Sequence, residues 1–173
     1  MGENRKLQGW AYGNAVLSRF PIRTSENYDL SVEGRESRGC LRADIVWPGS
    51  AVLHVFNVHL GTSFFERRVQ ARRLVAADLL ADLSLERPRL VLGDFNEWTS
   101  GLATRLLRSH MQSADIRTHL RRSRTYPGML PLLHLDHMYF DAELKLERLT
   151  LWRSRKAIVA SDHLPLTAEF TVA

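Results

Sequence analysis

The chain has 173 residues, of which 45% are hydrophobic and 25% charged, with a formal net charge of +5 at pH 7 and a single cysteine. This is the composition of one globular domain, and it excludes an intrinsically disordered chain and a disulfide-stapled one. No apolar run reaches the length of a transmembrane segment, and the N-terminal residues lack the apolar core of a signal peptide. We therefore expect a single domain over residues 1–173, located in the cytoplasm.

The first part of the chain predicts a short strand followed by a hairpin. The short strand covers residues 15–18 and is ended by Pro21. Residues 38–47 and 51–60 are longer strand patterns, and the Pro-Gly-Ser turn at 48–50 joins them into a hairpin. The second of these strands is apolar on both faces, which is typical of a central strand.

The middle of the chain predicts two helices with a strand between them. A long helix is expected over 64–83, because apolar residues recur there at steps of three, four and seven. That stripe consists of Phe65, Val69, Ala76, Leu80 and Leu83. An apolar strand follows at 89–93. Thr99 or Ser100 is then expected to cap a second helix that runs to about His110.

The last third predicts a loop and three strands. Residues 111–131 are basic and loop-like, whereas 133–140, 144–152 and 164–172 are strand patterns. Strands with helices between some of them indicate a layered α/β or α+β domain.

Polar side chains gather where the apolar residues of the predicted strands stop. They are Asn57 and His59, Asp94 and Asn96, His134, Asp136 and His137, and Asp162 and His163. Side chains alternate along a strand, so Asn57 and His59 share one face. Because rigid strand ends and their loops commonly carry active sites, these residues are candidates for chemistry.

Each candidate also has a plain structural explanation. Asp94 follows a glycine and can be a simple turn former, and His134 or His137 can be a satisfied polar group on a sheet surface. The HLDH sequence at 134–137 is a weak zinc pattern, because its side chains alternate between two faces. The sequence contains no phosphate-binding loop, dinucleotide-binding or zincin motif.

Taken together, five segments resemble the endonuclease/exonuclease/phosphatase superfamily of metal-dependent phosphodiesterases and phosphomonoesterases. In family order they are YGNAVLSRFPI (12–22), FNVHLG (56–61), VLGDFNEW (91–98), LDHMYF (135–140) and SDHLPLTAEF (161–170). The GDFN turn followed later by Ser-Asp-His-x-Pro is a specific pair of motifs. The resemblance implies an α/β (α+β) fold of the type I deoxyribonuclease kind, a two-layer β-sandwich flanked by helices.

The resemblance also implies roles for the matching residues. Asp94 matches the carboxylate that orients or deprotonates the attacking water, and Asn96 matches the amide that holds the phosphate. Asp162 matches a divalent-metal ligand, and His163 matches the histidine that contacts the scissile phosphate. Asp136 matches the carboxylate that orients an active-site histidine.

The remaining implied roles concern the leaving group and the metal. His59 matches a histidine that many members place near the leaving group, and Asn57 lies beside it as a candidate substrate contact. Asp94 is expected to share Mg²⁺ or Mn²⁺ with Asp162. A divalent cation suits this chemistry because it neutralises the phosphate anion before the nucleophile approaches. Amide and imidazolium donors then stabilise the transition state, each by on the order of 2–4 kcal/mol.

The chain departs from the family pattern at its start. Family members carry a metal-binding Asn and then a metal-binding Glu several dozen residues before the segment that matches Tyr12. Only 11 residues precede Tyr12 here, and Glu3 and Asn4 lie in a polar stretch for which we predict no strand. The chain is therefore expected to be the N-terminally incomplete, C-terminal two-thirds of the family domain. An upstream start, a short form that pairs as a homodimer, or a second chain that supplies the rest are the open explanations.

Two functions from different classes follow. The first is a Mg²⁺-dependent hydrolase of phosphate esters, inactive in this chain alone if the metal site is incomplete. The second is a non-catalytic module that binds nucleic acid or anionic lipid through its basic surface. The same arginines can also form an ordinary solvated helix face. They are Arg67, Arg68, Arg72 and Arg73, and Arg117, Arg121, Arg122 and Arg124.

The sequence does not distinguish between three substrate classes: nucleic acid, a phospholipid head group and a small phosphodiester. The loop 117–131 is the expected specificity element, with Arg124 as a substrate contact, and a plain basic connector is the alternative. Trp98 is expected either to line the same cleft or to pack in the core. Cys40 is expected to be a packed thiol, because little around it would lower its pKa.

Overall fold

The structure is a computed structural model that describes residues 1–47, 51–76, 79–80, 85–114 and 124–172. The predicted turn at 48–50 lies outside the described residues. The strands are β1 (Gly2–Leu7), β2 (Trp10–Asn14), β3 (Ile22–Asp29), β4 (Gly39–Val46), β5 (Val52–His59), β6 (Arg89–Asp94), β7 (Gln112–Ser113), β8 (Asp136–Phe140), β9 (Leu144–Leu151) and β10 (Leu166–Val172). The helices are α1 (Phe64–Leu74), α2 (Leu102–Arg108) and α4 (Arg155–Ala160).

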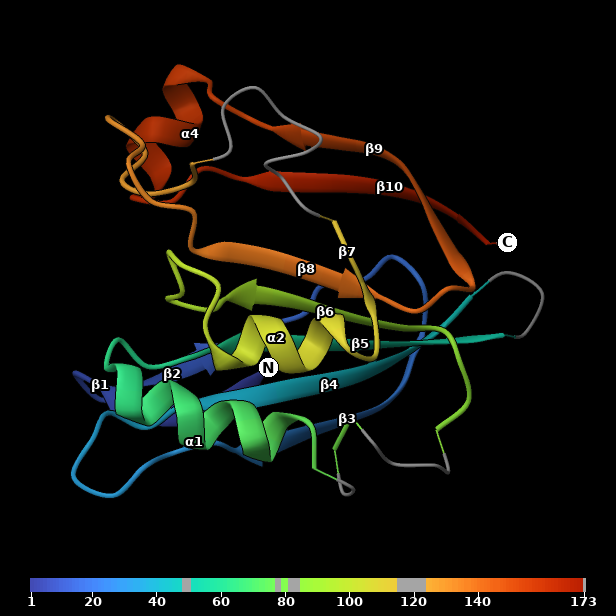
Figure 1. The fold of residues 1–173 in the computed structure, drawn as a ribbon, viewed down its shortest axis with the longest axis horizontal. Coiled ribbons are helices and arrows are strands. Elements are labelled where there is room, and N and C mark those ends of the chain that lie inside the picture. Colours follow the sequence, from blue (N-terminus) through green and yellow to red (C-terminus); the bar gives the residue numbers. More distant parts are fainter. Residues whose placement is uncertain (48–50, 77–78, 81–84, 115–123, 173) are drawn as a thin grey trace.

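A six-stranded sheet in the order β3-β4-β5-β6-β8-β7 forms the centre of the molecule (Figure 1). The predicted hairpin is confirmed as the antiparallel pair β4–β5. β5 pairs with β6 in parallel, and β6 pairs with β8 in the antiparallel sense. β5 and β6 therefore end at the same edge of the sheet where β8 begins.

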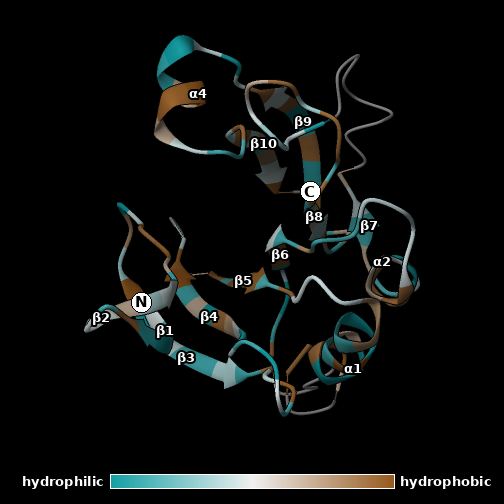
Figure 2. Ribbon diagram, turned by 90° about the vertical axis from the view of Figure 1, so that its left-hand side faces the viewer, coloured by the Kyte–Doolittle hydropathy of each residue, from teal (hydrophilic) through white to brown (hydrophobic). Residues whose placement is uncertain are grey.

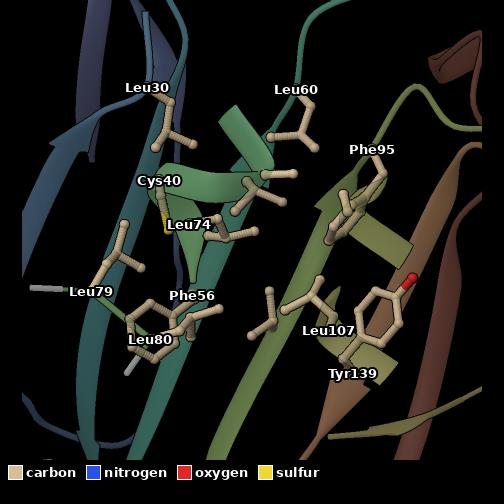
Figure 3. Packing of buried hydrophobic residues seen from close by; sticks show 14 of the residues in the cluster. Leu30, Cys40, Phe56, Leu60, Leu74, Leu79, Leu80, Phe95, Leu107 and Tyr139 are labelled. Carbon is tan, nitrogen blue, oxygen red and sulfur yellow. The ribbon is translucent and has the colours of Figure 1, made fainter. Parts of the chain in front are cut away.

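Helices α1 and α2 cover one face of this sheet, and the larger apolar core lies between them and the strands (Figure 3). Fully buried residues from the strands and from both helices meet in this core. Among them are Cys40, Phe56, Leu74, Val91, Phe95, Leu107 and Tyr139. Burial raises the pKa of the Cys40 thiol, which agrees with a packed rather than a nucleophilic cysteine.

The opposite face carries a second layer, the antiparallel hairpin β9–β10 (Figure 2). Residues of the hairpin such as Leu149, Leu166 and Phe170 pack in a separate apolar cluster against Val55 and Phe140 of the central sheet. Side chains of β5, β6 and β8 thus face alternately toward the helices and toward this hairpin. The predicted sandwich flanked by helices is confirmed.

Two predictions for the beginning of the chain are wrong. Residues 2–14 form the antiparallel hairpin β1–β2, where the polar start predicted no strand, and residues 15–18 are not a strand. The hairpin lies over β3 and β4, since Asn27 Nδ2 of β3 donates to the Glu3 carbonyl oxygen at 3.1 Å. Main-chain pairing within this surface hairpin needs no apolar pattern, so hydrophobic periodicity could not reveal it.

The predicted helix 64–83 is wrong in length and in its buried face. α1 ends at Leu74, residues 75–76 and 79–80 are not helical, and 77–78 and 81–84 lie outside the described residues. Phe65 is 79% exposed, and the buried positions are Glu66, Arg67, Gln70, Ala71 and Leu74. The polar groups are buried because they satisfy the backbone that follows β5. Gly61 N donates to Gln70 Oε1 at 2.8 Å, and Arg67 donates to the Gly61 carbonyl at 3.2 Å.

The second helix is confirmed, but its cap is not the one predicted. Gly101 is the N-cap residue and uses no side chain, so neither Thr99 nor Ser100 caps α2. The Glu97 carboxylate accepts hydrogen bonds instead from the backbone N–H groups of Ala103 at 3.2 Å and Thr104 at 3.1 Å. A carboxylate at this end also suits the helix dipole.

Four other elements, β3, α4, β7 and β8, also differ from the prediction. The edge strand β3 and the short helix α4 were not predicted, because neither has an apolar face of any length. β7 lies within the segment expected to be loop, and β8 begins at Asp136 rather than at 133. Within the part of the chain that the structure describes, no helix is long and apolar enough to cross a bilayer.

Candidate active site

Three neighbouring strands place three candidate residues side by side. In the parallel pair β5–β6, His59 is in register with Asp94, and in the antiparallel pair β6–β8, Asp94 is in register with Asp136. All three stand where the strand that carries them ends or begins. The fold therefore collects, in one row, residues that are 35 and 42 positions apart in the sequence.

His163 joins this row from the loop between α4 and β10. Its Nδ1 is 2.8 Å from Asp136 Oδ2, and its Nε2 is 3.8 Å from Asp94 Oδ2. His59 Nε2 is 3.6 Å from the same Asp94 oxygen. One carboxylate oxygen of Asp94 thus faces two imidazole rings, and the second ring is held in place by another carboxylate.

The other Asp94 oxygen fixes the turn that follows β6. Asn96 N donates to Asp94 Oδ1 at 2.8 Å, and Asn96 itself has a left-handed φ of 49°. The buried Asn96 amide nitrogen donates to the Leu60 carbonyl oxygen at 2.9 Å and retains a second N–H. Gly93 has a φ of 137°, and a Cβ there would lie 2.0 Å from the Val58 carbonyl oxygen. Glycine is therefore required for the close approach of the turn to β5.

Burial and neighbouring charges give the three titratable groups different properties. Burial raises the pKa of Asp94 to about 6, and the charge of Asp136 acts in the same direction. Burial together with the positive charge of Arg38 lowers the pKa of His59 to about 4. The hydrogen bond to Asp136 raises the pKa of His163 against the opposing effect of burial. At neutral pH the site combines a carboxylate, a neutral imidazole and an imidazole that favours its proton.

The expected metal ligand Asp162 lies next to His163 with an exposed side chain. Its main-chain oxygen accepts a hydrogen bond from Gly128 N at 2.7 Å, which ties the His163 loop to the segment before β8. Among the described residues, no group of three or more His, Cys, Asp or Glu side chains is arranged so that it could hold a metal ion as a closed site does.

The three predicted substrate contacts differ in their hydrogen bonding and in their exposure to solvent. Asn57 is on the same face as His59, but its amide nitrogen donates to the Ala15 carbonyl oxygen at 3.0 Å. Trp98 is 48% exposed, and the Arg67 guanidinium lies 5.4 Å from the centre of its ring. Arg124 is exposed at the beginning of the segment that leads to β8. These three roles remain predictions, and residues 117–123 of the expected specificity loop lie outside the described residues.

Two residues near the site had no assigned role in the sequence. Arg38 is buried, pairs with Glu36 at 3.0 Å and acts electrostatically on both His59 and Asp94. Asn14 is buried and donates to the Gly39 and Asn57 carbonyl oxygens at 2.8 and 2.9 Å. An arginine before a glycine gives no signal of a role for Arg38, whereas Asn14 lies in the first of the five segments that resemble the family.

Known proteins show which family shares this arrangement of residues. The model of the endonuclease/exonuclease/phosphatase family matches residues 4–163. The chain belongs to this family. The protein YbhP of Escherichia coli strain K12 is 40% identical over 176 residues, which cover 97% of the chain and 66% of YbhP. The chain thus spans slightly less than two thirds of the length of its curated relatives.

Solved structures of the family share the fold at low sequence identity. A mannosyl-6-phosphatase of Bacteroides thetaiotaomicron superposes with a TM-score of 0.72 and 14% identity over 88% of this chain and 67% of that one. A humanized TDP2 of D. rerio gives 0.73 and 15% over 89% and 68%. A conserved protein of Enterococcus faecalis V583 gives 0.73 and 19% over 88% and 67%. Membership in the family supports phosphoesterase-type hydrolysis as the general chemistry.

Proposed function

We propose that this chain carries the catalytic residues of a divalent-metal-dependent phosphodiesterase that hydrolyses phosphate esters by in-line attack of water. The observation that carries the proposal is the row of His59, Asp94 and Asp136 on three adjacent strands, completed by His163. A carboxylate between two imidazoles with different proton affinities is suited to handle both the nucleophile and a phosphoryl group.

In this proposal Asp94 orients and deprotonates the attacking water. Its Oδ1 is fixed by Asn96 N, so its Oδ2 is the oxygen that faces the substrate side of the site. The hydrogen bond to Asp136 raises the pKa of His163 and so favours the imidazolium form, in which Nε2 can donate to a phosphoryl oxygen. The free N–H of Asn96 is a second donor to the same group. His59 is neutral at pH 7 and is placed to act near the leaving group.

The oxygen donors at the site suit an open divalent-cation site rather than a closed one. Mg²⁺ is commonly held by one or two carboxylates, with water and substrate phosphate completing its coordination. Asp94, 3.8 Å from His163, and Asp162, the residue before His163, are carboxylates of this kind. When bound there, Mg²⁺ or Mn²⁺ would neutralise phosphate charge, which agrees with the general use of divalent metals in the family. A cytoplasmic location is part of the proposal and agrees with the single buried thiol, Cys40.

Hydrolysis of bis-p-nitrophenyl phosphate tests the proposal, measured with Mg²⁺, with Mn²⁺ and with EDTA. We expect turnover only with metal, and a loss of at least about 100-fold in His163→Ala, because a donor to the phosphoryl oxygen is removed. His110→Ala is the matched control, since His110 is exposed at the end of α2 and should leave the rate unchanged. Absence of metal-dependent turnover by the folded chain, or equal rates in both variants, contradicts the proposal.

A further inference from the structure

Beside the candidate active site, the chain presents large apolar side chains to solvent. In the segment between Tyr126 and Leu133, the side chains of Met129, Leu130 and Leu132 are 78%, 66% and 54% exposed. Single exposed apolar residues are ordinary on a protein surface, but contiguous ones on a monomer commonly mark a binding surface.

Helix α4 continues this apolar surface. None of its residues is buried, and Val159 is 82% exposed. Two hydrogen bonds, one on each side of α4, tie this helix to the segment before β8. Arg153 donates to the Met129 carbonyl oxygen at 3.1 Å, and Gly128 N donates to the Asp162 carbonyl oxygen at 2.7 Å. We call this surface the apolar rim, and it consists of Met129, Leu130, Leu132 and Val159.

The apolar rim adjoins the site directly. The ring of Tyr126 lies 4.9 Å from that of His163, and Leu164 N donates to the Thr125 carbonyl oxygen at 2.9 Å. Figure 1 shows α4 at the end of the molecule where β6 ends and β8 begins. A partner that contacts the rim is therefore next to His163.

The two segments that carry the apolar rim are positively charged, and the exposed carboxylate of Asp162 follows α4 by two residues. The described stretches 124–133 and 152–160 contain no Asp or Glu. Their cations, all exposed, are Arg124, Arg153, Arg155 and Lys156. An apolar surface bordered by cations favours a partner that is apolar inside and anionic at its boundary.

A second exposed apolar group lies on the other side of the site. Phe64 and Phe65, in the first turn of α1, are 58% and 79% exposed and follow His59 by five and six residues. Trp98, 48% exposed, follows Asn96 by two residues. In Figure 1, α1 and α4 lie on opposite sides of the strand ends that carry the site. Elements on both sides of these strand ends therefore carry exposed apolar residues.

We propose that this end of the molecule docks on an anionic lipid bilayer, with the apolar rim inserted between head groups and the surrounding cations on their phosphates. Aliphatic side chains favour a bilayer over single-stranded nucleic acid, because they offer no flat surface for base stacking. The docking claim stands apart from the proposed function. Its extension, that the phosphate ester hydrolysed belongs to a lipid head group, rests on that function.

Vesicle flotation in EDTA tests the docking without requiring turnover. The chain is mixed with vesicles of phosphatidylcholine alone or of equimolar phosphatidylcholine and phosphatidylglycerol. We expect binding to the anionic vesicles only. Two double variants should each lower the affinity for anionic vesicles by at least about tenfold: Met129→Glu/Leu130→Glu and Arg155→Glu/Lys156→Glu. Both place negative charge against an anionic surface. Val172→Glu is the matched control, because Val172 is similarly exposed (55%) at the end of β10 and should bind like the unaltered chain.

Three results would overturn the proposal. They are no binding to anionic vesicles, equal loss in the control and in the rim variants, and displacement from vesicles by an oligonucleotide whose binding is insensitive to Met129→Glu/Leu130→Glu. The last result would assign the cations to nucleic acid and would leave the apolar rim without a role in binding. Binding that behaves as expected, together with no hydrolysis of bis-p-nitrophenyl phosphate, would leave the docking intact and remove the proposed function alone.

Discussion

The two oxygens of Asp94 have separate surroundings, and this separation defines the site at the scale of single residues. Oδ1 is occupied by the backbone of Asn96, whereas Oδ2 lies 3.6 and 3.8 Å from the two imidazoles. His163 differs from His59 because a second carboxylate, Asp136, accepts from its far nitrogen. The pair of histidines is therefore asymmetric before any substrate arrives.

Titration tests whether Asp136 raises the pKa of His163. In Asp136→Asn, the pKa of His163 should fall, because the hydrogen bond that raises it loses its charge. NMR of the His163 ring protons across the acidic and neutral range measures this pKa. Asp162→Asn is the control and should lower the pKa by less, since Asp162 contributes least among the causes of the shift. A His163 pKa unchanged by Asp136→Asn would show that Asp136 does not hold the proton there.

Far from the site, strands β3, β4 and β5 are joined by a polar cluster around Asp44. Its carboxylate accepts from Thr24 Oγ1 at 2.6 Å and from Arg42 Nε at 2.8 Å, and it lies 2.7 Å from His54 Nδ1. Burial alone would raise the pKa of Asp44, but these hydrogen bonds outweigh it and lower the pKa to about 2. The three strands thus share one charged group that the unfolded chain does not stabilise.

This cluster gives a pH-dependent contribution to stability. The folded pKa of Asp44 lies below the unfolded value of about 3.9, so its contribution is complete above that value and is lost as the pH falls toward 2. Asp44→Asn should therefore lower the free energy of unfolding at pH 7 by about 2 kcal/mol, and the difference should disappear near pH 2. Urea denaturation at several pH values measures it. Glu169→Gln, with an exposed carboxylate, should change by less than about 0.5 kcal/mol, and a pH-independent loss in Asp44→Asn would contradict the linkage.

The elements that sequence could predict are those with an apolar pattern. Strands β4 and β5 bury residues on both faces, and β6 is partly buried along its length. Their apolar residues identified these strands and the polar residues at their ends. The β1–β2 hairpin, β3 and α4 lie at the surface, where main-chain pairing and local turns decide the structure. The apolar pattern mispredicted the buried face of α1, because Arg67 and Gln70 are buried to satisfy the backbone at Gly61 and Glu66 is buried as the acceptor of Gln70 Nε2.

At the scale of the whole molecule, the two faces of the central sheet are used differently. One face is closed by α1 and α2 over the larger core, and the other carries the β9–β10 hairpin (Figure 2). The site lies at the strand ends on the hairpin side, where the His163 loop reaches Asp136. Motif order indicated which residues belong together, whereas the row itself depends on strand register, which only the structure supplies.

The central claim is that Asp94 directs water to phosphorus, and hydrolysis of bis-p-nitrophenyl phosphate in ¹⁸O-labelled water tests it most directly. We expect the label in p-nitrophenyl phosphate and none in p-nitrophenol, with the rate reduced by at least about 100-fold in Asp94→Asn because the base is lost. Label in p-nitrophenol, or a rate unchanged by Asp94→Asn, would contradict the claim.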